Sequence, residues 1–329
     1  MKKFPAFRVF EKENGIFERR IVERDISDLP PGEVLVRVHY SGLNYKDALS
    51  AYGNKGVTRK YPHTPGIDAA GVIEETTGKL FKSGDKVIVS GFDLGMNTDG
   101  GFGQYINVPE KWVLPLPAGI SLKDSMIIGV SGFTAAQSVL EIVESGLKPE
   151  NGPILVTGAA GGVGSWCVVL LKNLGYYVIA GTSQIDDSAD FIRTLGADEH
   201  VDKSVIDDTS HHILKKWLWA GAIDNVGGNV LATALKRCKY GGTVTASGNI
   251  YSHELHTTVY PFILNAVRLI GISTQETSSI RKEKIFQLLA GKWKVASPPM
   301  VKEIGLDELD DALALFIKKK NRGQVLLIW

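Results

Sequence analysis

The chain has 329 residues, which suggests about two domains, and its 44% hydrophobic content is enough for ordinary globular cores. Its 37 basic and 36 acidic residues leave a formal net charge of +1, which argues against nucleic acid or an anionic membrane as a general partner. The two cysteines, Cys167 and Cys238, form no Cys-x-x-Cys pair and favour a reducing, cytoplasmic setting.

Membrane insertion, secretion and structural zinc are not expected either. No segment approaches the roughly 20 apolar residues of a transmembrane helix. Residues 1–5 begin no long apolar stretch, so we expect no signal peptide. A structural zinc site needs about four clustered Cys or His ligands, and the sequence shows no such cluster.

The first 120 residues predict a small, mostly β domain. Residues 33–40 alternate in polarity, with Val34, Val36 and Val38 on one face of a strand. Turn signals separate the further short apolar runs, which lie at 69–73 and 86–89, and residues 100–108 predict a bend followed by a strand.

The pattern changes near Ser121, which with Asp124 resembles a helix start. Helical periodicity follows over 131–144. From residue 152 on, strands are expected at 153–157, 176–181, 222–226, 241–247 and 267–272, and helices at 162–174, 186–195 and 228–238. This alternation predicts a parallel sheet covered on both faces, with a ligand at the carboxyl ends of the strands.

The last segment predicts a strand at 300–304, a helix at 306–319 and a strand at 324–329. Two arrangements remain open for it. It either caps the α/β domain or returns to the first domain.

The glycine-rich turn within residues 153–165 is the most informative motif of the chain. A short apolar strand, 154–156, breaks into glycines and is followed by apolar residues at helical spacing. Such a turn points backbone N–H groups and the positive end of a helix at a pyrophosphate. Gly161 lets the backbone approach the phosphates, and Gly164 lets helix and strand pack closely. The motif predicts a dinucleotide site.

The tip of the next strand bears on the choice of cofactor. NAD-binding folds usually place Asp or Glu there, bonded to the ribose 2′-hydroxyl. This chain has Thr182, Ser183 and Gln184 after Gly181. Small hydroxyl residues leave room for a 2′-phosphate and donate to it, so NADP is favoured.

Taken together, these motifs resemble the zinc-free, quinone-oxidoreductase-like branch of the medium-chain dehydrogenase/reductase superfamily. Within that branch the chain is similar to the YhdH/YhfP-type group, which includes bacterial acrylyl-CoA reductases. The resemblance covers nearly the whole chain, and the order and spacing of the motifs make it specific. The matching stretches are 41–48 (SGLNYKDA), 65–71 (PGIDAAG), 129–135 (GVSGFTA), 157–165 (TGAAGGVGS), 221–228 (GAIDNVGG) and 257–264 (TTVYPFIL).

The resemblance implies an α/β protein with a GroES-like β domain and a Rossmann domain built on a doubly wound parallel sheet. The GroES-like catalytic domain would span 1–120 and be completed by 295–329, with the nucleotide-binding Rossmann domain at 121–294. Zinc-dependent relatives carry a His-Glu pair after the Pro-Gly of the first domain, where this chain has Ile67 and Asp68. We therefore expect no metal site, and we interpret the upstream His63 as a surface or loop histidine.

The same resemblance places the chemistry at Asn44 and Tyr45. The tyrosine hydroxyl would hydrogen-bond the substrate carbonyl as negative charge develops, or relay a proton. Asn44 would orient the nicotinamide carboxamide or a substrate oxygen, and Asp47 is expected to cap the following helix or bond Lys46. Without zinc there is no metal to polarise an alcohol, which favours hydride addition to an activated C=C or a quinone.

Further residues are implied to contact the cofactor. The turn residues would line the phosphates, the strand-tip residues would face the adenosine ribose, and the others would approach the pyrophosphate or nicotinamide. The implied set is Tyr45, Thr134, Gly161, Gly162, Val163, Gly164, Thr182, Ser183, Gln184, Ser247, Gly248, Ile272 and Ser273.

Some positions depart from the family pattern. Basic residues that often follow the strand-tip serine and the next helix are replaced by Ile185 and, near Ala197, by Asp198 or Glu199. NADH therefore stays open beside NADPH. Gln324 stands where an arginine is common, so the binding of a CoA thioester stays open as well.

The resemblance implies a zinc-independent NAD(P)H-dependent reductase of an α,β-unsaturated carbonyl, with acrylyl-CoA as one candidate. A quinone oxidoreductase and a non-catalytic NADP-binding redox sensor are the alternatives. A small-molecule enone, acyl-CoA or quinone is the expected partner. A homodimer is expected too, with the apolar strand 269–272 at its edge.

Overall fold

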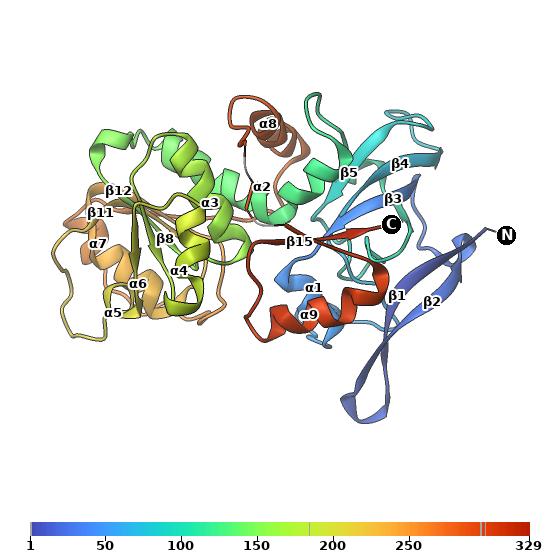
Figure 1. Ribbon diagram of the computed structural model, residues 1–329, viewed down its shortest axis with the longest axis horizontal. Helices are drawn as coiled ribbons and strands as arrows, with labels where there is room; N and C mark the ends of the chain where they lie inside the picture. Colours follow the sequence, from blue (N-terminus) through green and yellow to red (C-terminus); the bar gives the residue numbers. More distant parts are fainter. Residues whose placement is uncertain (1, 184, 297, 300) are drawn as a thin grey trace. The chain divides into compact units, whose positions relative to one another are not determined.

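The computed structural model describes residues 2–183, 185–296, 298–299 and 301–329. These residues form two compact units (Figure 1). The first unit comprises Met1–Val130, Thr274–Gly291 and Met300–Trp329, and the second comprises Ser131–Ser273 and Lys292–Pro299. This division groups 121–130 and 274–291 with the N-terminal sheet, whereas the sequence analysis assigned both to the Rossmann domain. The domain limits drawn from the sequence stay a prediction.

The first unit is built on a seven-stranded sheet in the order β14-β15-β3-β4-β5-β7, with β6 also paired to β3. A separate hairpin pairs β1 with β2. The elements of this unit are β1 (Lys3–Glu11), β2 (Phe17–Asp25), β3 (Val34–Gly42), α1 (Tyr45–Ala51), β4 (Asp68–Thr76), β5 (Lys86–Ser90), β6 (Tyr105–Val108), β7 (Val113–Pro115), α8 (Ser279–Ala290), β14 (Val301–Ile304), α9 (Leu309–Ile317) and β15 (Gln324–Ile328).

The alternation expected around residues 33–40 is present in β3. Val34, Val36 and Val38 are buried in one cluster, and Leu35 is buried in another on the opposite face. Covering both faces fixes the register of β3, since a one-residue slip would turn every side chain to the wrong side. The end of β3 therefore holds the start of the following loop in a fixed position.

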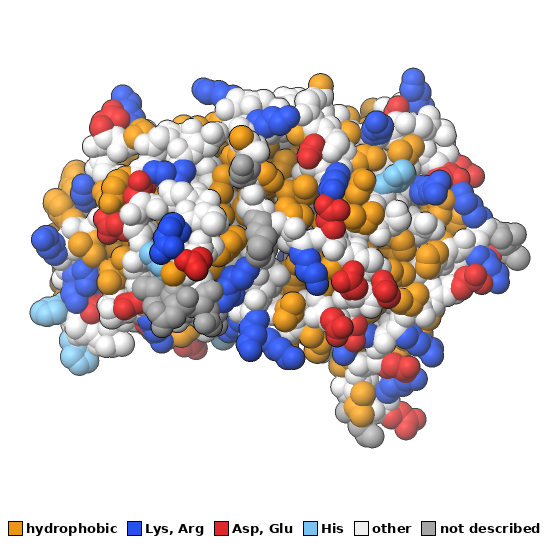
Figure 2. Space-filling model, in the orientation of Figure 1, with side chains coloured by type: hydrophobic (Ala, Val, Ile, Leu, Met, Phe, Trp, Pro, Cys, Tyr) orange, Lys and Arg blue, Asp and Glu red, His pale blue; other side chains and the backbone are white. Residues whose placement is uncertain are grey.

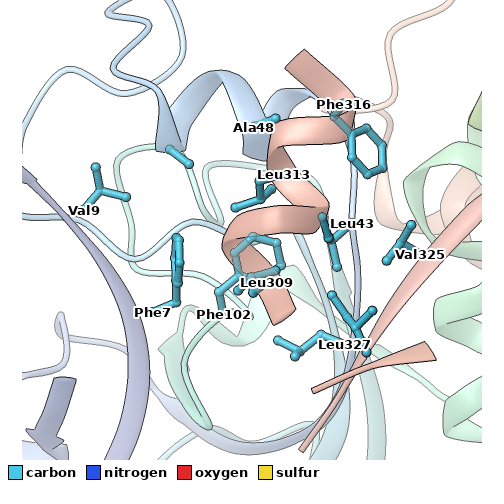
Figure 3. Close-up of a cluster of buried hydrophobic side chains, with 13 residues drawn as sticks. Phe7, Val9, Leu43, Ala48, Phe102, Leu309, Leu313, Phe316, Val325 and Leu327 are labelled. Atoms are coloured by element: carbon cyan, nitrogen blue, oxygen red, sulfur yellow. The ribbon is translucent and has the colours of Figure 1, made fainter. Parts of the chain in front are cut away.

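The C-terminal segment belongs to this first sheet. Leu326 and Leu327 of β15 lie opposite Gly42 and Ser41 of β3 in antiparallel register. Figure 3 shows Leu309 and Leu313 of α9 beside the labelled side chains of β1, α1 and β15 in one buried cluster. Of the two arrangements left open for this segment, the return to the first unit is the one observed.

The second unit contains a six-stranded, fully parallel sheet in the order β10-β9-β8-β11-β12-β13. This is the doubly wound order expected of a dinucleotide-binding sheet. Its elements are α2 (Leu122–Glu144), which begins in the first unit, β8 (Ile154–Thr157), α3 (Gly162–Asn173), β9 (Val178–Gly181), α4 (Ile185–Thr194), β10 (Glu199–Val201), α5 (Lys203–Ile206), β11 (Trp219–Asp224), α6 (Gly228–Lys236), β12 (Cys238–Ala246), α7 (Tyr260–Ile263) and β13 (Arg268–Gly271).

The expectation that no segment approaches a membrane span was wrong by length and composition, because one helix in the described part of the chain, α2, meets both criteria. However, 78% of its apolar stretch is buried inside the protein, as in the core helix of a globular protein. Gly129 also breaks the helix, with φ 50° and ψ −162°. On the visible face of Figure 2, basic and acidic side chains are interspersed, in keeping with the net charge of +1.

Candidate functional site

Asn44 and Tyr45 lie where β3 ends and α1 begins. Asn44 is the N-cap of α1, and its backbone N–H donates to Asp47 Oδ2 at 2.8 Å. The other carboxylate oxygen of Asp47 accepts from the backbone N–H of Ile67 at 2.8 Å. Asp47 therefore caps its own helix and ties it to the loop before β4. The burial of this carboxyl group raises the pKa of Asp47 to about 7.

The side chain of Asn44 is held by Asp68 at the start of β4. Asn44 Nδ2 donates to Asp68 Oδ2 at 2.9 Å. Asp68 also accepts from Ser90 Oγ at 2.6 Å and from the backbone N–H of Val130 at 2.7 Å. A Cβ on Gly129 would lie 2.9 Å from Asp68 Oδ2, so the break in α2 is what lets the Val130 amide reach the carboxylate. The amide group of Asn44 is thereby fixed in one orientation.

A buried lysine approaches the same carboxylate. Lys282 of α8 is 1% exposed, donates to Ser90 O at 2.8 Å and lies 3.4 Å from the centroid of the Phe92 ring. Burial lowers the pKa of Lys282 to about 8 and raises the pKa of Asp68 above its usual value, while the positive charge of Lys282 opposes the latter shift.

This lysine was not predicted from the sequence, although a signal was present. Lys282, Ile285, Phe286 and Leu289 are all buried and follow the i, i+3, i+4, i+7 spacing of one helix face. A charged residue on an apolar stripe is a candidate for a buried pair. No helix was expected over 279–290, so the stripe went unrecognised.

Tyr45, the first residue of α1, is partly buried and packs against the cluster drawn in Figure 3. Within the described part of the chain, its hydroxyl forms no hydrogen bond. The ring is therefore supported by apolar contacts while the oxygen remains available to a ligand, as a donor to a substrate carbonyl requires.

The glycine turn of the second unit lies between β8 and α3, as expected. Gly158 has φ +61°, and a Cβ on Gly164 would lie only 2.2 Å from the carbonyl oxygen of Gly158. Only glycine fits at Gly164, because the first turn of α3 packs directly on the preceding loop. Among the described residues, the backbone N–H groups of Val163 and Gly164 have no acceptor. These features suit an anionic group at the N-terminus of the helix.

Hydrogen bonds join the carboxyl ends of three neighbouring strands, β8, β11 and β12. Thr157 Oγ1 donates to Asp224 Oδ1 at 2.7 Å, and Asn225 Nδ2 donates to Thr157 O at 2.8 Å. Ser247 Oγ donates to Asn225 Oδ1 at 2.8 Å. Burial raises the pKa of Asp224 to about 6. Ser247 and Gly248 were predicted for this edge. The hydrogen bonds by which Asp224 and Asn225 join the strand ends were not predicted.

The strand-tip residues follow β9, with Thr182 buried and Ser183 exposed. Gln184 lies outside the described residues. The nearby acid Asp198 is engaged elsewhere, since both of its carboxylate oxygens accept from Lys172 Nζ at 2.7 Å. Thr182 and Ser183, which directly follow β9, therefore present hydroxyl groups and no carboxylate.

The remaining predicted contacts are distributed along the second unit. Ile272 and Ser273 follow β13, where the backbone N–H of Ile272 donates to Ala246 O at 2.9 Å. Thr134 is buried on α2. The structure thus brings 161–164, Thr182, Ser183, Ser247, Gly248, Ile272 and Ser273 to the carboxyl edge of one sheet. Asn44 and Tyr45 lie in the first unit. Contact with a cofactor stays a prediction for all of them.

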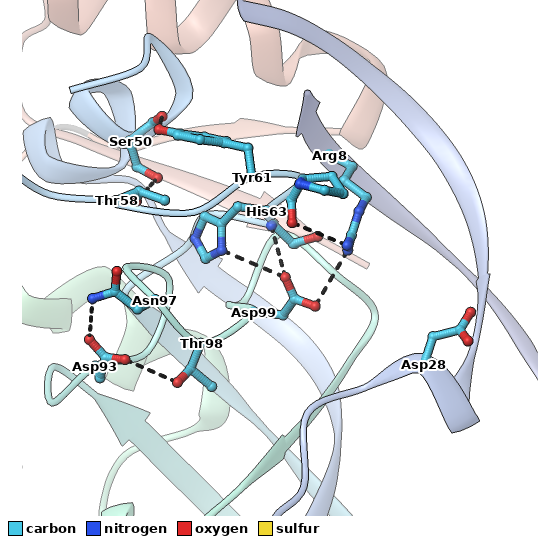
Figure 4. A network of polar contacts seen from close by, with 12 residues as sticks. Arg8, Asp28, Ser50, Thr58, Tyr61, His63, Asp93, Asn97, Thr98 and Asp99 are labelled. Carbon is cyan, nitrogen blue, oxygen red and sulfur yellow. Dashed lines mark hydrogen bonds and ion pairs between the residues drawn. The ribbon is translucent and has the colours of Figure 1, made fainter. Parts of the chain in front are cut away.

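His63 lies in the loop between α1 and β4, which fits the loop part of its interpretation as a surface or loop histidine, but the surface part was wrong. His63 is 3% exposed, pairs with Val9 in an isolated β-bridge, and has Nδ1 3.7 Å from Asp99 Oδ1 (Figure 4). Strand β1 covers it through this bridge. Burial lowers the pKa of His63, which favours the neutral ring.

The side chains that could serve as metal ligands do not fit a zinc ion. No group of three or more His, Cys, Asp or Glu side chains in the described residues is placed to hold a metal. Asp68, next to Ile67, is committed to hydrogen bonds from Ser90, Asn44 and Val130. Cys167 and Cys238 are buried, and burial raises the pKa of both thiols, which disfavours the thiolate that zinc requires.

Comparison with known proteins identifies the family. Residues 30–118 match the model of the alcohol dehydrogenase GroES-like domain, and residues 162–290 match that of the zinc-binding dehydrogenases. The protein YhfP of Bacillus subtilis, whose name assigns it to the quinone oxidoreductases, is 38% identical over 98% of both chains. This chain belongs to the medium-chain dehydrogenase/reductase superfamily, in its quinone-oxidoreductase-like branch.

Three further comparisons agree. The acrylyl-CoA reductase AcuI of Ruegeria pomeroyi is 38% identical over 96% of both chains. The yhdH oxidoreductase of Salmonella enterica, solved with NADP, has a TM-score of 0.93 at 36% identity and 99% coverage of both chains. The structure of YhfP, solved with NAD, has a TM-score of 0.96 at 36% identity over 100% of both chains.

The expected fold, a GroES-like β domain with a Rossmann sheet, is confirmed by these matches. The chain is an oxidoreductase of this branch, which sets aside the non-catalytic alternative.

Proposed function

We propose that the chain is a zinc-independent, NADPH-dependent reductase of a C=C bond activated by a carbonyl group, with an acrylyl thioester such as acrylyl-CoA as substrate. The observation that carries the proposal is the 38% identity to an acrylyl-CoA reductase over 96% of both chains. The carboxylate of Asp68 already accepts hydrogen bonds from Asn44, Ser90 and Val130, which supports a reaction in which the substrate's own carbonyl is the activating group.

NADPH is proposed as the reductant, because the yhdH relative was solved with NADP and the tip of β9 carries Thr182 and Ser183 in place of an acid. NADH remains the alternative, because YhfP was solved with NAD. The Val163 and Gly164 amides would hold the pyrophosphate, and Ser247 would lie at the ribose edge. When bound, the cofactor supplies a hydride to the β-carbon of the acceptor.

The chain's own residues would then stabilise the charge that develops on the substrate and orient the reacting groups. Reduction of an acrylyl thioester by NADPH and one proton gives a propionyl thioester and NADP⁺. Negative charge develops on the thioester oxygen as the hydride arrives, and the Tyr45 hydroxyl would donate a hydrogen bond to it. Asn44, fixed by Asp68, would orient a polar group of the cofactor or substrate.

The proposal is tested by following NADPH oxidation with acrylyl-CoA, with methyl vinyl ketone and with benzoquinone, in buffer containing a zinc chelator. We expect turnover with acrylyl-CoA to continue in the chelator and mass spectrometry to show propionyl-CoA. Absence of turnover with both the thioester and the ketone would overturn the proposal. Turnover with benzoquinone alone would support the second candidate, a quinone oxidoreductase, which the name of YhfP favours.

A homodimer is proposed as the assembled form. β13 is an edge strand of the six-stranded sheet, and the segment before it exposes Val259, Ile263 and Leu264 at 61%, 66% and 54%. Unpaired edges beside apolar surface favour pairing with a second copy. Light scattering at micromolar concentration should give twice the chain mass of 35.7 kDa, and a monomer would contradict the dimer.

A further inference from the structure

We infer that a basic pocket in the first unit, formed around Lys46 and Arg59, binds the phosphate groups of the acyl-CoA substrate. This inference rests on the proposed function and sharpens it. It makes the preferred substrate a phosphate-bearing acyl thioester and not an uncharged enone or a quinone. The pocket has a volume of about 310 Å³ and takes residues from α1, from the loop at 56–59, from the loop after β5 and from residue 275.

The two cations that line the pocket have few protein partners. Lys46 is partly buried, and its Nζ has one hydrogen bond, a long one of 3.3 Å to Gln275 Oε1. Arg59 is exposed, and its guanidinium has no hydrogen bond or ion pair within the described residues. The backbone N–H of Arg59 donates to Asn97 Oδ1 at 3.2 Å, which anchors the arginine at the rim. Both charges are therefore available to an anion.

Asp93 is the acid among the described lining residues, and its carboxylate is already engaged. Asn97 Nδ2 donates to Asp93 Oδ1 at 2.9 Å, and Thr98 Oγ1 donates to Asp93 Oδ2 at 3.2 Å (Figure 4). Neither cation is paired with this carboxylate. The pocket thus carries two cations against one hydrogen-bonded acid, and the excess positive charge favours an anionic ligand.

The place of the pocket in the chain connects it with the proposed chemistry. Lys46 directly follows Tyr45, so the pocket and the candidate catalytic residue share the first turn of α1. Ligand pockets span about 300 to 1,000 Å³, so this volume suits one portion of a large ligand. A thioester carrying a nucleotide has such a portion, remote from its reacting carbons. Guanidinium and ammonium groups are the usual protein partners of phosphate.

The test compares two substrates that share the acrylyl thioester. Acrylyl-CoA carries the phosphates, and the acrylyl thioester of N-acetylcysteamine lacks them. The measured quantity is the ratio of kcat/KM for acrylyl-CoA to kcat/KM for the short thioester. The variants are Arg59→Gln and Lys46→Gln, with Lys60→Gln as matched control. Lys60 is an exposed neighbour that does not line the pocket.

We expect each pocket variant to lower this ratio by about tenfold, the loss typical of one charge-assisted hydrogen bond. The control should leave the ratio unchanged. In the unaltered protein, added salt should raise KM for acrylyl-CoA more than KM for the short thioester. The Kd for NADPH should be the same in all variants.

Three outcomes would overturn the inference. The ratio stays constant in both pocket variants, the control lowers it equally, or the pocket variants weaken NADPH binding in place of acrylyl-CoA. All three leave the proposed function intact, because the unaltered protein still reduces both thioesters. Failure of the unaltered protein to reduce either thioester would instead refute the proposed function, and this inference with it.

Discussion

Asn44 and Asp68 are joined by a buried hydrogen bond of 2.9 Å between the amide Nδ2 and the carboxylate Oδ2. The resemblance to the family implies that Asp68 occupies the position where zinc-dependent relatives carry the second residue of a His-Glu pair. In this chain its carboxylate binds an amide, a hydroxyl and a backbone N–H. Asp68 thus holds the side-chain amide of Asn44 in place.

Replacing Asp68 by Asn should uncouple Asn44 from β4. An amide at this position keeps the volume but presents one acceptor oxygen to three donors. We expect kcat with acrylyl-CoA to fall about 10- to 100-fold, because misplacement of a positioning group costs that much, while the Kd for NADPH changes little. Asp311→Asn, at an exposed position on α9, is the control. Equal kcat in Asp68→Asn and the control would show that the contact is structural alone.

Removal of the Tyr45 hydroxyl tests its proposed part in the reaction. Phenylalanine keeps the ring against the apolar cluster, so the thermal midpoint should stay within about 2 °C of the unaltered value. Loss of one donor to developing charge should lower kcat about 100-fold. The readouts are steady-state kinetics and thermal unfolding, with Tyr52→Phe, an exposed tyrosine, as the control. Unchanged kcat in Tyr45→Phe would remove the hydroxyl from the mechanism.

The strand tip after β9 is expected to set the cofactor preference. Ser183→Asp introduces a carboxylate at an exposed position where a 2′-phosphate is proposed to lie. Repulsion should raise KM for NADPH by at least about tenfold and change KM for NADH little, because a like charge beside the phosphate costs more than about 1 kcal/mol. Thr209→Asp, also exposed, controls for added negative charge. If Ser183→Asp changes KM for NADPH and KM for NADH equally, the strand tip does not contact the 2′-phosphate.

The raised pKa of Asp47 predicts that the stability of the folded chain depends on pH. Burial raises its pKa from 3.8 to about 7, so between these values the folded chain binds a proton that the unfolded chain has released. The contribution of Asp47 protonation to the free energy of unfolding is therefore complete below pH 3.8 and is lost as the pH rises through about 7. The free energy of unfolding, measured by urea denaturation, should fall less steeply across this window in Asp47→Asn.

Asp68 and Asp224, whose pKa values are also raised by burial, act in the same direction, so the dependence should flatten in Asp47→Asn without vanishing. Asp311→Asn should follow the unaltered protein at every pH. An identical slope in Asp47→Asn would mean that Asp47 titrates near its ordinary pKa.

Local patterns predicted the parts of the fold that follow simple rules. The alternation of β3, the Ser121–Asp124 helix start and the glycine turn before α3 depend on neighbours in sequence, and all three are present. α8 was missed because its charged residues mask a short apolar stripe. His63 was misassigned because its burial depends on β1, which is more than fifty residues away in the chain.

The candidate site could be predicted only in part for the same reason. Asn44 and Tyr45 were found through a resemblance to a family, and the turn glycines through their spacing. Contacts such as Asn44–Asp68 and Thr157–Asp224 join residues on different strands, which no local pattern reveals. Lys46 and Arg59 share a pocket because the chain folds back after α1, and their charges alone gave no sign of it.

The central claim is tested most directly by one measurement, the product formed from acrylyl-CoA and NADPH by the purified protein in the presence of a zinc chelator. We expect one propionyl-CoA for each NADPH oxidised, at a rate that the chelator leaves unchanged. Loss of activity on chelation, or NADPH oxidation without propionyl-CoA, would contradict it.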